Sequence, residues 1–92
     1  MAAIDNAKYL NGTTSQAIKS AAGALYGIVV NSHTSGTLKL WDNTAGSGTV
    51  LLNTITFAAG SGINLSFPTG VSFNTGLFVT VGGTIDYTIL YF

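Results

Sequence analysis

The sequence predicts an all-β protein: an antiparallel β-sandwich or jelly-roll-like barrel of about seven to eight short strands, preceded by a short N-terminal arm. From residue 16 onward, Thr, Val, Ile and aromatic side chains dominate, as they do in strands. Clusters of Gly, Asn and Ser interrupt them about every 8 to 12 residues, which is the spacing of short strands and turns. Several apolar runs also alternate with polar residues, which is the pattern of half-buried antiparallel strands.

The N-terminal residues 1–15 differ from the rest, and the 92-residue chain divides into this segment and a single β-domain over residues 16–92. Residues 2–10 allow a short helix, because Asp5 and Lys8 are three positions apart and would be neighbours on its surface. The Asn, Gly, Thr and Ser residues at 11–15 would end such a helix. The segment is too short to fold alone, so we expect an arm that reaches a neighbouring molecule or a frayed end.

Eight segments share a high content of β-branched and aromatic residues: 16–20, 25–32, 37–42, 49–58, 62–67, 71–73, 77–81 and 84–91. Alternation is clear in the last of them, where Ile85, Tyr87 and Ile89 share one face while Asp86 and Thr88 share the other. The residues between the segments favour turns, because Gly, Asn and Asp accept positive φ. We expect turns at residues 31–36, 43–48, 59–62 and 68–70, and a two-residue hairpin at 82–83.

The chain is unusually poor in charge. Its three lysines and three aspartates make up 7% of the residues, whereas an average soluble domain carries about 25%. Little charge repulsion then opposes association, so we expect the protein to work in an assembly. Three scattered lysines offer too few phosphate contacts for nucleic-acid binding. No apolar run approaches the roughly 20 residues that cross a bilayer, and we expect neither a membrane partner nor a signal peptide.

Candidate catalytic and metal-binding residues are few. His33, with Ser32, Ser35 and Asp42, has the residue types of a nucleophilic triad, but no nucleophile-elbow motif surrounds either serine and these residues are typical of turns. Asp42 and Asn43 carry oxygen ligands suited to calcium, yet a calcium site takes about six to eight oxygens and usually several carboxylates. The absence of cysteine removes thiolate zinc sites. We therefore expect no catalytic residue, no metal and no cofactor, and a protein that is not an enzyme.

Trp41 is the main candidate for an interaction residue. In the segment 37–42, Leu38 and Leu40 share one face, so Thr37, Lys39 and Trp41 lie on the other. If the leucines face the core, Trp41 lies outside, where it packs on a neighbouring subunit or presents its ring to a sugar. A strand bulge would instead return the ring to the core.

The C-terminal strand also has two apolar faces, because Leu90 and Phe92 oppose the row that contains Ile85 and Tyr91. We expect both faces of this strand to be buried, as in a central strand or in a contact between subunits. The candidate protein-interface residues are therefore Trp41, Lys39, Thr37, Leu90 and Phe92, and the alternative glycan-binding set is Trp41, Asp42 and Asn43.

Two stretches carry a family resemblance: LYGIVVNSHTSGTLKLWDNTAG at residues 25–46 and FAAGSGINLSFPTGVSFNTGLFVTVGGTIDYTILY at residues 57–91. With phrases such as GTLKLWD, FPTGV and GLFVTVGGT, the chain resembles small β-sandwich structural proteins of tailed-bacteriophage virions over roughly residues 18–91. These motifs are structural, and none of them is a catalytic signature.

The resemblance implies a capsid decoration or cement protein that sits on the head shell, often as a trimer. It implies two partners, further copies of the chain itself and the major capsid protein, and a place on the capsid surface of the virion after synthesis in the host cytoplasm. Other proteins of this kind belong to tails or fibres, so the alternative is a carbohydrate-binding module that recognises host-surface glycans. Low charge is compatible with a cement role, because apolar and backbone contacts can seal joints between capsomers.

Overall fold

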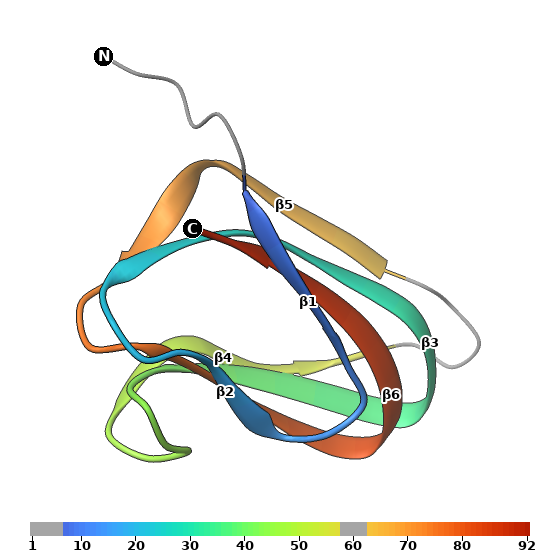
Figure 1. Cartoon of the computed structure of the whole chain (residues 1–92). Helices are drawn as coiled ribbons and strands as arrows, with labels where there is room; N and C mark the ends of the chain where they lie inside the picture. Colours follow the sequence, from blue (N-terminus) through green and yellow to red (C-terminus); the bar gives the residue numbers. More distant parts are fainter. Residues whose placement is uncertain (1–6, 58–62) are drawn as a thin grey trace.

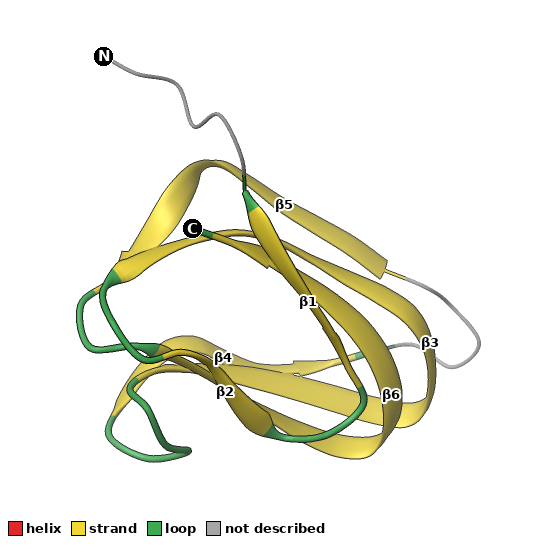
Figure 2. Cartoon of the chain, in the orientation of Figure 1, coloured by secondary structure: helices red, strands yellow, loops and turns green. Residues whose placement is uncertain are grey.

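The computed structural model describes residues 7–57 and 63–92, and this part of the chain forms six β-strands and no helix (Figures 1 and 2). The strands are β1 (Lys8–Gly12), β2 (Gln16–Lys19), β3 (Gly23–Asp42), β4 (Thr49–Thr56), β5 (Ile63–Phe73) and β6 (Leu77–Tyr91). They join in one sheet in which each of the observed pairings is antiparallel. The all-β, antiparallel class that the sequence predicts is therefore confirmed.

The two longest strands, β3 and β6, lie side by side at the centre of the sheet and pair along most of their length. Both bend at the same level, between Thr34 and Thr37 of β3 and around Gly82 and Gly83 of β6, and this folds the sheet over on itself (Figure 1). The upper half in this view consists of β1, β5, residues 23–34 of β3 and residues 84–91 of β6. The lower half consists of β2, β4, residues 37–42 of β3 and residues 77–82 of β6.

The predicted count of seven to eight strands is wrong, because three predicted turns lie inside continuous strands: residues 31–36 in β3, 68–70 in β5 and 82–83 in β6. Positive φ does occur in them, at Ser35 (50°), Gly70 (77°) and Gly83 (68°), and the pairing shifts register near each. Such bulges bend a strand without reversing it. The predicted turn at 43–48 does connect β3 to β4, and the one at 59–62 falls on residues outside the described ranges.

The short helix allowed by the sequence over residues 2–10 does not form at its described end, where Lys8–Gly12 is strand β1. This strand pairs residue by residue with β6, from Lys8 opposite Tyr91 to Gly12 opposite Tyr87. Leu10 packs against the core from the same strand. Tertiary pairing and burial here override a weak local helix propensity, and β1 is part of the sheet.

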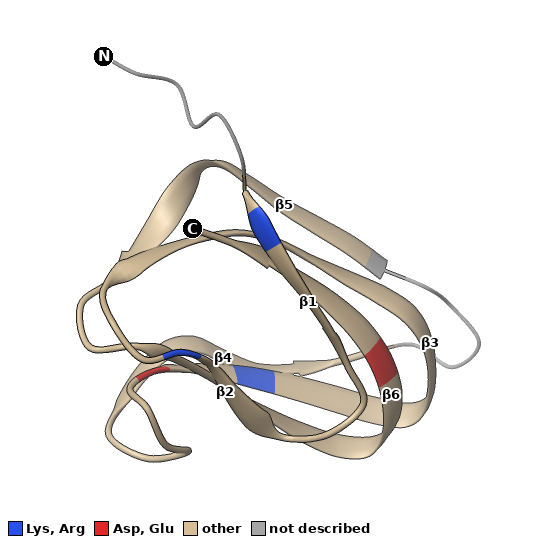
Figure 3. Cartoon of the chain, viewed as in Figure 1, with Lys and Arg blue, Asp and Glu red and all other residues tan. Residues whose placement is uncertain are grey.

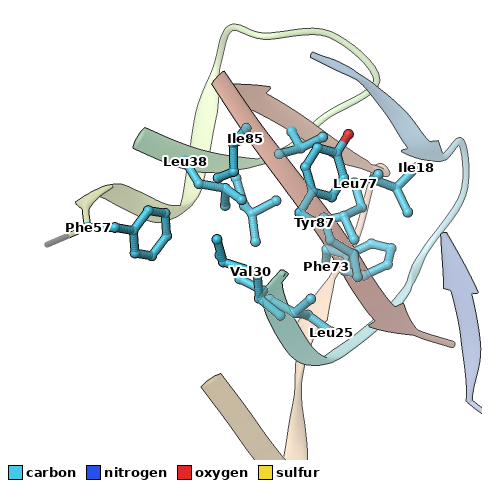
Figure 4. Packing of buried hydrophobic residues seen from close by; sticks show 13 residues of the cluster. Ile18, Leu25, Val30, Leu38, Phe57, Phe73, Leu77, Ile85 and Tyr87 are labelled. Carbon is cyan, nitrogen blue, oxygen red and sulfur yellow. The ribbon is translucent and has the colours of Figure 1, made fainter. Parts of the chain in front are cut away.

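The hydrophobic core fills the space between the two halves of the folded sheet, with side chains pointing into it from both (Figure 4). The predicted alternation in the last strand is confirmed, because Ile85, Tyr87 and Ile89 are at most 1% exposed. The buried cluster consists of Ile18, Leu25, Ile28, Val30, Leu38, Leu40, Phe57, Phe73, Leu77, Val79, Ile85, Tyr87 and Ile89.

Candidate functional site

The Trp41 side of β3 forms part of the outer face of the lower half. Leu38 and Leu40 are fully buried, and the alternating residues between and after them, Lys39 and Trp41, point away from the core. The indole Nε1 of Trp41 donates a hydrogen bond to Thr80 Oγ1 at 3.0 Å. The Lys39 Nζ lies 4.3 Å from the centroid of the indole ring, a cation–π contact. The Trp41 ring is therefore held on the outer face by two contacts within its own subunit.

A row of apolar residues crosses this outer face, because cross-strand pairing places Ala17, Phe78, Trp41 and Val50 side by side on four strands. The loop that joins β3 to β4 rests on part of the row. A Cβ atom at Gly46 would lie 3.3 Å from Phe78 Cε1, so the loop backbone is close to that ring. The chain thus covers part of this face itself.

The carboxylate of Asp42, the second member of the predicted glycan set, binds the loop between β5 and β6. It accepts hydrogen bonds from the backbone N–H groups of Asn74 at 3.0 Å, Thr75 at 2.8 Å and Gly76 at 3.5 Å. The bonds from Thr75 and Asn74 lower the pKa of Asp42 below its ordinary value, because they stabilise the charged form. Asp42 is a clamp between the end of β3 and a loop 32 to 34 residues away in sequence.

Asn43, the third member of that set, caps its own turn. Its Nδ2 donates to the Ser47 carbonyl oxygen at 2.7 Å, and its Oδ1 accepts from the Thr44 N–H at 2.8 Å. The polar groups of Asp42 and Asn43 are thus engaged within the chain. This engagement argues against the alternative in which they, with Trp41, recognise a glycan.

Replacing Asp42 tests the clamp. We expect Asp42→Asn to lower the free energy of unfolding by about 1 kcal/mol, which is less than the roughly 1.5–3 kcal/mol typical of bonds to a charged group because the site is open to water. For a domain of this size that loss corresponds to roughly 4–8 °C in melting temperature, measured by circular dichroism. Because the folded-state pKa of Asp42 is lowered, its contribution is present above the ordinary carboxyl pKa and is lost as the pH falls through the folded value. The stability of Asp42→Asn should therefore fall less steeply than that of the parent protein as the pH is lowered into the acid range.

Asp86→Asn is the matched control, because it removes the same charge from a carboxylate whose hydrogen bond comes from a side chain, Asn31 Nδ2, at 3.3 Å. We expect this control to melt close to the parent protein at neutral pH. Equal losses in the two variants would contradict the clamp.

Leu90 and Phe92, the other two predicted interface residues, lie on the outer face of the upper half, and the structure does not bring them together with Trp41. Tyr9 of β1 is the cross-strand partner of Leu90 and therefore joins the same face. Tyr9 is 69% exposed and Phe92 is 48% exposed. The sequence reasoning missed Tyr9 because it assigned residues 1–15 to an arm or a short helix, although Tyr9 and Asn11 flank the inward Leu10 in strand-like alternation.

Next to this apolar group, the same outer face carries a chain of polar contacts across three strands. Asn31 Nδ2 of β3 donates to Asp86 Oδ1 and to Thr88 Oγ1 of β6, each at 3.3 Å. The Thr88 hydroxyl donates in turn to Asn11 Oδ1 of β1. The outer face of the upper half is therefore apolar at one end and polar at the other.

His33 lies at the bend of β3 and has structural contacts. Its Nδ1 accepts a hydrogen bond from the Gly36 N–H at 3.2 Å, and its ring centroid lies 5.5 Å from that of Phe57. Asp42 lies at the end of the same strand with its carboxylate bound to the β5–β6 loop. The structure therefore does not assemble these two residues into a catalytic pair.

Across residues 7–57 and 63–92, no three His, Cys, Asp or Glu side chains are grouped so that they could hold a metal ion. The same residues contain no helix that is long and apolar enough to span a membrane. In comparisons with known proteins, no protein-family model, no curated protein and no solved structure matches the chain.

Proposed function

We propose that this chain is a non-enzymatic structural protein of a tailed-bacteriophage virion, which decorates and cements the head shell by binding the major capsid protein as a homo-oligomer. The observation that carries the proposal is a nearly uncharged surface with large apolar side chains exposed on both outer faces: Tyr9, Phe92 and Val50. Exposed aromatic residues together with few charges are typical of surfaces that become buried in assemblies.

The shape of the protein also supports a role in cementing. We infer that the two halves of the folded sheet act as the two layers of a β-sandwich, since a single hydrophobic core lies between them. Such a unit exposes one outer face on each side, and these faces can bind different neighbours.

The surface area is sufficient for more than one contact. The accessible surface of the chain is 4983 Å², and a standard specific interface takes about 800 Å² from each partner, or about one sixth of it. Two separate contacts, one to another copy and one to the shell, are therefore compatible with its size.

The edge strand β4 (Thr49–Thr56) supports assembly as well. It pairs with β3 on one side and with no described strand on the other, and its sequence TVLLNTIT contains neither a charge nor a proline. Natural proteins usually protect such edges with lysine, proline or a covering element. An edge without that protection is suited to pairing with backbone groups of a neighbour.

Mass spectrometry of purified virions tests the proposed function. We expect the protein in many copies per particle, and a reconstruction of the particle should place it on the head shell. Virions without the protein, or with copies confined to the tail, would contradict the proposal.

A further inference from the structure

We draw no further inference here: the strongest candidate, the exposed apolar patch around Tyr9 and Phe92 on the outer face of the upper half, carries none, because Lys8 lies on the other side of β1 from Tyr9, the charges of this half (Figure 3) therefore select no partner, and nothing in the structure shows what covers the patch.

Discussion

Gly83→Ala should lower the free energy of unfolding by about 2–5 kcal/mol, because it adds a side chain where the paired strands β3 and β6 bend together. Gly83 has a φ of 68°, a left-handed conformation that costs an L-residue about 1–2 kcal/mol. An added Cβ would also lie 2.3 Å from the Ser35 carbonyl oxygen and 2.8 Å from that of Thr34. These contacts are to backbone atoms of β3, so relief requires the paired strand to move.

Gly48→Ala separates the two causes. Gly48 has a φ of 87°, but a Cβ there would meet only the Asn43 side chain, at 2.9 Å from its Nδ2. We expect a loss of about 1 kcal/mol in this variant, from backbone conformation and a small side-chain shift. Urea unfolding of both proteins measures the difference, and equal losses would show that the bend tolerates a side chain.

The bend illustrates which part of the fold could be predicted from sequence. The sequence predicts chain-reversing turns at residues 31–36 and 82–83, and the structure has positive φ there, at Ser35 and Gly83, without a reversal of the chain. The same local chemistry suits a hairpin reversal and a bulge that bends a continuous strand. The outcome depends on the pairing of β3 with β6 on both sides of the bend, and this long-range match is not visible in either segment alone.

The faces of individual strands were predictable because alternation is a local property. Leu38 and Leu40 are buried and Trp41 points outward, as the pattern indicates. The contacts that decide what each outer face can do were not predictable. Asp42 binds backbone groups more than 30 residues away, and Tyr9 reaches an outer face only because β1 pairs with β6.

Tyr87→Ala should lower the free energy of unfolding by about 3–5 kcal/mol, because it removes a fully buried ring from the centre of the core. The hydroxyl contributes separately. It donates to the Thr14 carbonyl oxygen at 2.6 Å and accepts from Gln16 Nε2 at 3.0 Å, which fixes the connection between β1 and β2. Tyr87→Phe, which keeps the ring, should therefore cost about 1–2 kcal/mol. Hydrogen exchange of the β1–β2 segment should rise in this variant, and unchanged exchange would contradict the role of the hydroxyl.

The parent protein and Tyr87→Phe should also differ in how their free energy of unfolding changes at alkaline pH. Burial raises the pKa of Tyr87, and the hydrogen bond from Gln16 opposes this only in part. The folded state therefore holds the phenolic proton more tightly than the unfolded state, so the stabilisation is complete below the ordinary phenol pKa of about 10 and declines as the pH rises through the folded value. Ionised Tyr87 also has no proton to donate to Thr14. The stability difference between the parent protein and Tyr87→Phe should thus shrink above about pH 10, as measured by urea unfolding from pH 7 upward. The other tyrosines occur in both proteins and cancel in this difference, so a gap that stays constant with pH would show that Tyr87 is solvated in the folded state.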